Sequence, residues 1–103
     1  MYDIVYLPIA RQDITEILLY ISDHLKVPNA AMELLQAFDE SISLLKEFPY
    51  AHRVYRPVRP MEEEYRLLPV KNYIVFYVVQ EHEKRIEIKR VLYARMDLTR
   101  IIK

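Results

Sequence analysis

The stretch YIVFYVV, residues 73–79, is the longest apolar run in the chain and the strongest indication of its architecture. All its residues are β-branched or aromatic, the types that favour a strand. Because neither face of the run carries a charge, both faces must be covered by other parts of the protein, which predicts a central strand. A polar turn at residues 80–84 follows it. We therefore expect a sheet in which this segment lies between two other strands.

Residues 64–70 and 85–92 flank the central run and are its predicted partner strands. Pro69 cannot donate a hydrogen bond to a neighbouring strand, so the first partner should be an edge strand or contain a bulge. The second partner alternates between apolar and polar residues, the period of a strand. This alternation places Ile86, Ile88 and Leu92 on one face and Glu87, Lys89 and Val91 on the other.

Arg90 is the exception, because alternation puts it on the apolar face with Ile88 and Leu92. Either a β-bulge turns its side chain outward, or it is a buried arginine that needs a carboxylate partner. Asp13 and Asp97 are the candidate partners. The first interpretation leaves Arg90 available to a binding partner, and the second makes it structural.

The N-terminal half carries a short apolar strand at residues 4–7 and then two segments with helical spacing. Helices are predicted over residues 8–25 and 28–47, each beginning at a proline, whose missing N–H is harmless there. Pro49 stops the second helix, because the residue before a proline disfavours the helical conformation. The short connection makes the two helices an antiparallel hairpin. The predicted apolar stripes are Ile14, Ile17, Leu18, Ile21 and Leu25, then Ala31, Leu34, Leu35, Phe38, Ile42, Leu45 and Phe48, with Asp13, Glu16 and Asp23 on the outer face of the first helix.

The element order is therefore βααβββ, an α+β fold in a single domain over residues 1–103. The helical hairpin should pack on one face of a mainly antiparallel sheet and leave the opposite face partly open. The tail, residues 96–103, has the pattern of a short C-terminal helix with Asp97 as its N-terminal cap. The resulting core should combine Ile17, Leu35 and Phe38 with residues 73–79.

The composition excludes several classes of protein. The chain has no cysteine, which excludes disulfides and thiolate metal ligands, and no glycine, which excludes the phosphate-binding loops of nucleotide enzymes. We expect no cofactor and no metal, since His24 and His82 show no ligand spacing. No apolar run approaches the roughly 20 residues that a membrane span needs. Residues 1–3 do not begin a signal peptide, so we expect a cytoplasmic protein without membrane association.

Charge is distributed unevenly, although the formal net charge is zero. Residues 1–50 carry three basic and eight acidic side chains, whereas residues 51–103 carry twelve basic and seven acidic ones. The basic half can meet an anionic partner, either nucleic acid or an acidic protein segment, although chance asymmetry and a solvated loop explain the pattern too. The predicted contacts are Arg53, Arg56 and Arg59 in the irregular segment 49–62, together with Lys71, Lys89 and Arg90.

Five segments taken together resemble the RelE/ParE toxins, also called plasmid stabilisation proteins. In chain order they are residues 10–21 (ARQDITEILLYI), 28–31 (PNAA), 45–49 (LKEFP), 65–77 (YRLLPVKNYIVFY) and 88–97 (IKRVLYARMD). Each segment is a weak signal alone, but their order and spacing over nearly the whole chain are specific for this superfamily. The resemblance implies a growth-inhibiting toxin that a cognate antitoxin neutralises in a hetero-oligomer.

Two kinds of target are implied by this resemblance. RelE-like toxins cut mRNA on the ribosome, whereas ParE-like toxins poison DNA gyrase without being enzymes. Arg66 stands where the nuclease branch has a catalytic basic residue, but Leu68 and Ile74 stand where that branch has further basic residues. The C-terminal tyrosine of the nuclease branch is replaced in this chain near Ile101. The resemblance therefore favours gyrase as the target, with a ribosome-dependent mRNA endonuclease as the first alternative and a degenerate, antitoxin-binding homologue as the second.

If the chain cleaves RNA, the expected catalytic residues are His52, Arg66, Tyr93 and Arg95. Cleavage without a metal requires proton transfer from the 2′-hydroxyl, proton transfer to the leaving oxygen, and cations that stabilise the phosphorane. A histidine suits the proton transfers near neutral pH, whereas an arginine supplies charge alone. The structural alternatives are an exposed loop histidine at position 52 and an ion pair between Arg66 and Glu64.

Overall fold

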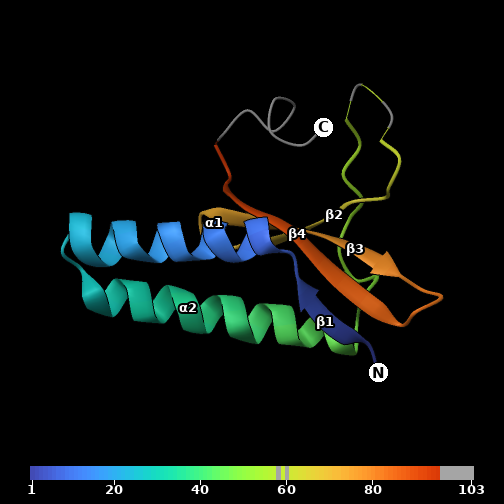
Figure 1. Cartoon of the computed structure of the whole chain (residues 1–103), viewed down its shortest axis with the longest axis horizontal. Coiled ribbons are helices and arrows are strands. Elements are labelled where there is room, and N and C mark those ends of the chain that lie inside the picture. Colours follow the sequence, from blue (N-terminus) through green and yellow to red (C-terminus); the bar gives the residue numbers. More distant parts are fainter. Residues whose placement is uncertain (58, 60, 96–103) are drawn as a thin grey trace.

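The computed structural model describes residues 1–57, 59 and 61–95, which form a helical hairpin packed on a four-stranded sheet (Figure 1). This two-layer arrangement confirms the predicted α+β fold and its βααβββ order. The predicted C-terminal helix at residues 96–103, with Asp97 as its cap, lies outside the described residues. The elements are β1 (Asp3–Tyr6), α1 (Pro8–Leu19), a π-helical turn η1 (Tyr20–His24), α2 (Pro28–Ser43), a 3-10 turn η2 (Leu44–Lys46), β2 (Arg66–Val70), β3 (Tyr73–Gln80) and β4 (Arg85–Tyr93).

Prolines begin both helices, and lysines occupy the turns that need a left-handed backbone. Pro8 and Pro28 stand in the first turns of α1 and α2. Lys26 follows η1 with a φ of 56°, and Lys71 and Lys84 in the two hairpin turns have φ values of 53° and 51°. Glycine takes this conformation at little cost, but the chain has none, so each lysine bears the steric penalty of its Cβ atom.

The strand order in the sheet is β1-β4-β3-β2. β1 pairs with β4 in parallel, whereas β4 with β3 and β3 with β2 are antiparallel, so the sheet is mainly antiparallel. The apolar run at residues 73–79 forms the centre of the sheet as β3, as predicted. β2 is an edge strand, and an edge tolerates Pro69 because the missing N–H can face away from the neighbouring strand.

A β-bulge in β4 changes which residues share a face. The pairing of β4 with β3 skips Lys89, and one extra residue reverses the faces that follow it. Val91 therefore lies in the main core with Ile88, and Leu92 faces the other side of the sheet. The prediction that Leu92 shares a face with Ile88 is wrong for this reason.

The main core lies between the helical hairpin and the sheet. Phe38 is 2% exposed and Ile17 packs against the same cluster, as predicted. Leu35 is 41% exposed, however, and Leu25 and Phe48 are also largely exposed, so the predicted stripes were too wide. The fully or nearly buried members of the cluster are Ala10, Leu34, Phe38, Ile42 and Leu45 from the helical half and Leu68, Val70, Val75, Tyr77, Ile86, Ile88 and Val91 from the sheet.

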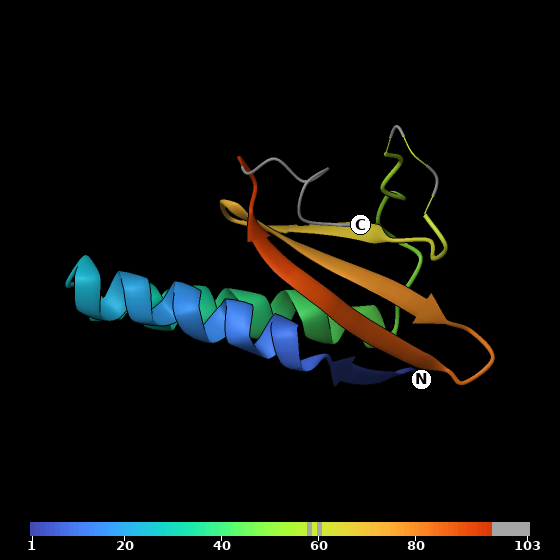
Figure 2. The same cartoon turned by 45° about the horizontal axis from the view of Figure 1, so that its top comes forward.

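A second, smaller apolar cluster covers the opposite face of the sheet, which we expected to be partly open. In Figure 2 the described residues that lead into β2, 53–57 and 61–65, lie on this side, away from the helices, and we call them the covering segment. Backbone bonds hold this segment to itself and to β2, including Tyr55 N–H to Tyr65 O at 2.7 Å and Leu67 N–H to Arg53 O at 3.0 Å. Tyr55, Met61 and Tyr65 pack there on Leu67, Ile74, Phe76 and Leu92.

Candidate functional site

Arg66, the predicted catalytic cation, begins β2 and is held by three neighbours. Its Nη1 donates to the backbone oxygen of His52 at 2.8 Å, and its Nη2 pairs with Glu64 Oε1 at 3.0 Å. Its guanidinium carbon lies 4.9 Å from the centre of the Tyr50 ring, a cation–π contact. The Arg66 side chain is 15% exposed. The ion pair with Glu64 that we named as the structural alternative is therefore present.

Tyr50 extends this arrangement to Glu81 in the turn between β3 and β4. The hydroxyls of Tyr50 and Tyr2 donate to Glu81 Oε1 at 2.7 and 2.5 Å, and Lys84 pairs with the other carboxylate oxygen. The bonds from Lys84 and the two hydroxyls lower the pKa of Glu81 to about 2. The same carboxylate raises the pKa of Tyr50 to about 12, because it favours the protonated hydroxyl. The cluster thus joins the N-terminus, the segment after η2 and the β3–β4 turn.

His52, the predicted acid–base residue, is half-buried rather than exposed. Its ring packs edge-on against the ring of Tyr77, with 6.4 Å between the ring centroids. Tyr77 is fully buried, and its hydroxyl donates to the backbone oxygen of Pro49 at 2.8 Å. Burial raises the pKa of Tyr77 to about 12. The surroundings of His52 are therefore those of a packing residue at the edge of the core.

The other two predicted catalytic residues lie at the opposite end of the sheet. Tyr93 ends β4 and lies opposite Tyr73, the first residue of β3. Arg66, in β2, lies opposite Tyr77, which like Tyr73 belongs to β3. Tyr73 and Tyr77 are four residues apart along β3, a distance of about 13 Å, and β2 and β4 lie two strand spacings apart, about 10 Å. Arg95 follows β4 and is exposed. The structure does not bring the four predicted residues together.

The predicted partner-binding cations fall into two groups. Arg53, Arg56, Arg59 and Lys71 are exposed, and they remain candidates for contact with an anionic partner. The side chains of Lys89 and Arg90 are only 14% and 23% exposed, and each is paired with a carboxylate. The structure gives these two residues a structural role, because acidic neighbours within the fold already neutralise them.

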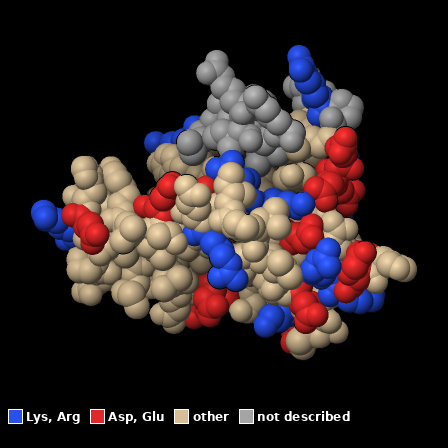
Figure 3. Space-filling model, viewed as in Figure 1, with Lys and Arg blue, Asp and Glu red and all other residues tan. Residues whose placement is uncertain are grey.

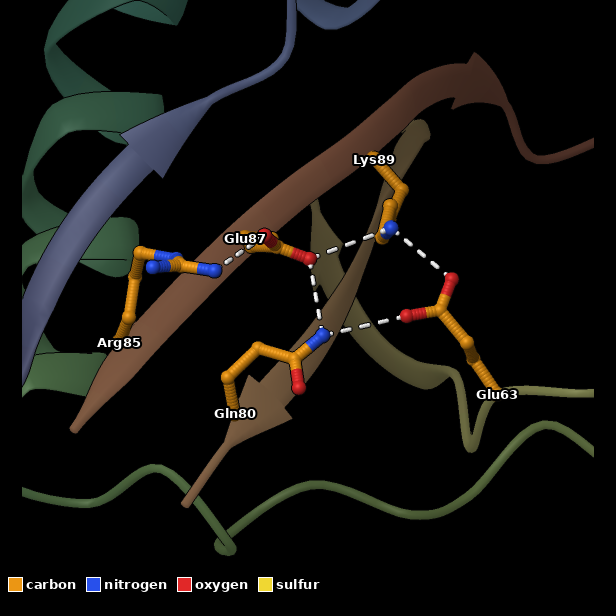
Figure 4. Close-up of polar contacts among 5 residues, drawn as sticks. All are labelled: Glu63, Gln80, Arg85, Glu87 and Lys89. Carbon is orange, nitrogen blue, oxygen red and sulfur yellow. Dashed lines mark hydrogen bonds and ion pairs between the residues drawn. The ribbon is translucent and has the colours of Figure 1, made fainter. Parts of the chain in front are cut away.

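Lys89 belongs to a polar network on the sheet face that is turned away from the helices (Figure 4). Its Nζ lies 2.9 Å from Glu63 Oε1 and 3.2 Å from Glu87 Oε1. Gln80 donates to both carboxylates at 3.2 and 3.0 Å, and Arg85 pairs with Glu87 at 3.0 Å. The bond from Gln80, followed by those from Lys89 and Arg85, lowers the pKa of Glu87. Since Glu63 belongs to the covering segment, the network ties that segment to β3 and β4.

Arg90 pairs with Asp13 of α1, the first of the two partners that the sequence suggested. Its Nε and Nη2 lie 2.8 and 3.0 Å from the two carboxylate oxygens. Asp13 also accepts a hydrogen bond from the backbone N–H of Val91 at 2.9 Å. Val91 lies beyond Ile88, the last residue of β4 that pairs with β1. Asp13 is 9% exposed, so its assignment to the outer face of the first helix is wrong. Both interpretations of Arg90 hold in part, since the bulge and the ion pair occur together.

A groove of about 640 Å³ lies beside this ion pair, between the helical hairpin and the end of the sheet. Tyr20 and Leu25 line it from the hairpin and are 53% and 50% exposed. The sequence pattern did not reveal the groove, because periodicity places Leu25 in the core and cannot show that the hairpin extends past the sheet (Figure 1). The other lining residues are Asp13, Glu16, Ile17, Tyr73, Arg90, Val91, Leu92 and Tyr93.

Two further properties bear on the chemistry that the described residues can perform. Among residues 1–57, 59 and 61–95, no three side chains of the metal-binding types gather closely enough to hold an ion. No helix in that part of the chain has both the length and the apolarity to cross a membrane. The exposed arginines and the groove are among the features of the described residues that are available for contact with other molecules.

Several solved structures share the fold, and three of them are described here. A chain of the chromosomal ParDE system from P. aeruginosa matches with a TM-score of 0.68 at 17% identity, over 92% of this chain and 98% of that one. A metal-bound toxin from Helicobacter pylori gives 0.64 at 14% identity, over 90% and 94%. A chain of the archaeal RelE–RelB complex from Pyrococcus horikoshii gives 0.62 at 15% identity, over 93% and 98%.

Comparison of the sequence with family models identifies the family. No curated protein matches the sequence. The family model described as "ParE toxin of type II toxin-antitoxin system, parDE" matches residues 4–98, which is nearly the whole chain. This chain therefore belongs to the ParE toxin family of type II toxin–antitoxin systems, within the RelE/ParE superfamily.

Proposed function

We propose that this toxin arrests bacterial growth by binding DNA gyrase and that it does not cleave mRNA. The observation that carries the proposal is the separation of the groups that RNA cleavage needs. Arg66 is paired with Glu64 and covered by Tyr50 at one end of the sheet. Tyr93 and Arg95 lie at the other end.

The separation matters because the cleavage step is demanding in its geometry. A general acid or base must lie within hydrogen-bond reach of the proton that it transfers, directly or through one water. The cations must contact the oxygens on which charge develops. Groups at two ends of a sheet, one of them already neutralised by a carboxylate, do not meet these conditions around a single phosphate. A toxin that acts by binding needs a surface and no such constellation.

We further propose that a cognate antitoxin neutralises the toxin in the cytoplasm by forming a complex with it. Solved relatives with the same fold come from a ParDE system and from a RelE–RelB complex, and both names include an antitoxin. The exposed Arg53, Arg56 and Arg59 are available for acidic residues of such a partner. A neighbouring reading frame that encodes a small protein is the expected source of the antitoxin.

Induction of the gene in bacterial cells tests the target. A gyrase poison damages DNA, so we expect induction of the SOS response and filamentation, while incorporation of labelled amino acids continues in the first minutes. Prompt loss of protein synthesis without DNA damage would assign the toxin to the ribosome. A culture that grows normally would make the chain a degenerate homologue that binds its antitoxin.

Two conservative variants sharpen this test. Tyr93→Phe and His52→Gln remove a hydroxyl and an imidazole while keeping side chains of similar size. If the toxin acts by binding gyrase, both variants remain toxic, since neither group transfers a proton. Loss of toxicity in both variants, together with mRNA that the wild type cuts and the variants leave intact, would support RNA cleavage and contradict the proposal.

A further inference from the structure

The covering segment carries three consecutive glutamates, Glu62–Glu64, beside two cations of the sheet. Glu63 Oε1 lies 2.9 Å from Lys89 Nζ, and Glu64 Oε1 lies 3.0 Å from Arg66 Nη2. The two basic side chains are only 14% and 15% exposed. One short acidic run therefore neutralises both cations, although they belong to different strands, β4 and β2.

The two ion pairs lie on opposite faces of the sheet. Arg66 lies opposite Tyr77, and residues paired in this way share a face, which here is the face covered by the helices. Lys89 lies on the other face, where Glu63 contacts it (Figure 4). Neighbouring glutamates thus reach around the edge of the sheet and bring one carboxylate to each side.

A pocket of about 280 Å³ lies between the acidic run and the end of β3. Arg66 and Gln80 line it together with all three glutamates of the run. The charged groups in its lining are therefore three carboxylates and one guanidinium. A phosphate that entered would meet more negative than positive charge, and like-charge contacts of this kind suppress binding of the wrong partner.

Without the carboxylates, the same place would suit a nucleic acid. The Arg66 guanidinium has the planar donor geometry that binds phosphate, and the Tyr50 ring beside it is 49% exposed and could stack on a base. Lys89 would supply a second cation nearby. Figure 3 shows acidic side chains among the basic ones at the end of the sheet with the β3–β4 turn, so the basic groups there are interrupted by negative charge.

We propose that Glu63 and Glu64 are specificity-determining residues that exclude RNA from this pocket. They hold Lys89 and Arg66 in ion pairs, and they present negative charge to an approaching phosphate. The inference rests on the proposed function, because it names the residues that keep this toxin from binding mRNA. It predicts that removing the two carboxylates creates RNA binding, a gain that a purely structural role of the ion pairs would not give.

The test variant combines Glu63→Gln with Glu64→Gln, which removes two negative charges and keeps the size of the side chains. These side chains are 37% and 60% exposed, so the variant should fold, and circular dichroism checks this. If the pair unfolds, Glu64→Gln alone replaces it, with a smaller expected gain. The matched control combines Glu33→Gln with Glu40→Gln, which changes the net charge equally at two exposed residues of α2.

The probe is a fluorescently labelled single-stranded RNA oligonucleotide, titrated with each purified full-length toxin and followed by anisotropy. At low salt the test variant should bind at least about tenfold more tightly than the wild type. The slope of log affinity against log salt should steepen by about 1.4, since each of two freed cations contributes about 0.7. The control should gain less than about threefold, because charges elsewhere act only through a screened field.

A further variant identifies the groups that bind the RNA. Arg66→Gln and Lys89→Gln, added to the test variant, should return the affinity to the wild-type value. Equal RNA affinity of the test variant and the α2 control would overturn the proposal. A gain that survives the loss of both cations would overturn it too, as would a wild type that already binds as tightly as the test variant.

Assays of the wild type separate this inference from the proposed function. If the test variant gains no RNA affinity while the wild type still inhibits gyrase, the inference falls and the proposed function stands. If the wild type cuts mRNA on ribosomes, the proposed function is refuted, and the exclusion of RNA by Glu63 and Glu64 is refuted with it.

Discussion

Replacing Asp13 with alanine removes the carboxylate that joins α1 to the bulged edge of β4. Three bonds disappear with it, two from the guanidinium of Arg90 at 2.8 and 3.0 Å and one from the N–H of Val91 at 2.9 Å. The Asp13 side chain is 11% exposed and that of Arg90 is 23% exposed. The substitution therefore leaves a mostly buried cation and a backbone donor without their partner.

The expected loss follows from these contacts. Breaking a buried ion pair by removing one member costs about 3–5 kcal/mol, and the partial exposure of Arg90 places this pair near the lower end. Alanine recovers about 0.5 kcal/mol, because it favours a helix more than aspartate does. The free energy of unfolding should therefore fall by about 2.5 kcal/mol, which lowers the Tm of a domain of this size by about 10–20 °C.

Urea titration followed by circular dichroism measures this change, with two companions. Glu16→Ala, one turn away on the exposed side of α1, should alter the unfolding free energy by less than about 0.5 kcal/mol. Asp13→Ala combined with Arg90→Met removes both charges and should be more stable than Asp13→Ala alone. The double variant leaves only the N–H of Val91 without its partner, whereas the single variant also leaves the buried Arg90 cation unpaired. An Asp13→Ala protein as stable as Glu16→Ala, or a double variant no better than the single one, would refute the structural role of the pair.

Three further perturbations test other parts of the fold. Glu81→Gln should flatten the dependence of the unfolding free energy on pH between about 4.5 and about 2. The ionised Glu81 carboxylate stabilises the fold above pH 4.5, and this contribution is lost as the pH falls through its lowered pKa of about 2. Urea midpoints at a series of pH values measure the effect, and an acid profile like that of the wild type would contradict it. Lys71→Gly should raise the unfolding free energy by about 0.5–1 kcal/mol because φ is 53° there, whereas a lower value would contradict the assigned turn. Lys89→Met should speed amide hydrogen exchange in residues 53–57 and 61–63, because the ion pair with Glu63 ties these residues to the sheet; equal exchange rates in the two proteins would argue against the tie.

Periodicity predicted the elements of this fold because each helix and strand repeats its pattern over several turns or pairs. The apolar run at residues 73–79 identified the central strand, and Pro69 identified an edge. Alternation failed in β4, since one inserted residue at Lys89 changes the faces of Val91 and Leu92 without any change in the local composition. A bulge depends on the pairing with the neighbouring strand, which a single segment does not encode.

The helices and the site show the same limit. Asp13 has the sequence pattern of a surface residue, and its burial depends on Arg90, far away in the chain. The covering segment has no periodicity, so its contacts with the sheet through Met61 were not predictable. The proposed catalytic set combined His52 with Tyr93 from residue type and position in the sequence, but His52 packs on Tyr77 whereas Tyr93 lies opposite Tyr73, four residues away along β3. Residue type shows which chemistry is available, whereas tertiary pairing decides which groups meet.

Gyrase and the ribosome can be distinguished as targets by supplying the purified toxin with each of them in parallel reactions. One reaction contains DNA gyrase, ATP and relaxed plasmid, and the other contains ribosomes translating an end-labelled mRNA. We expect supercoiling to stop, gyrase-linked DNA breaks to accumulate and the mRNA to stay full-length. Cleavage of the mRNA within ribosome-bound codons, with supercoiling unaffected, would instead make the ribosome the target and refute gyrase binding.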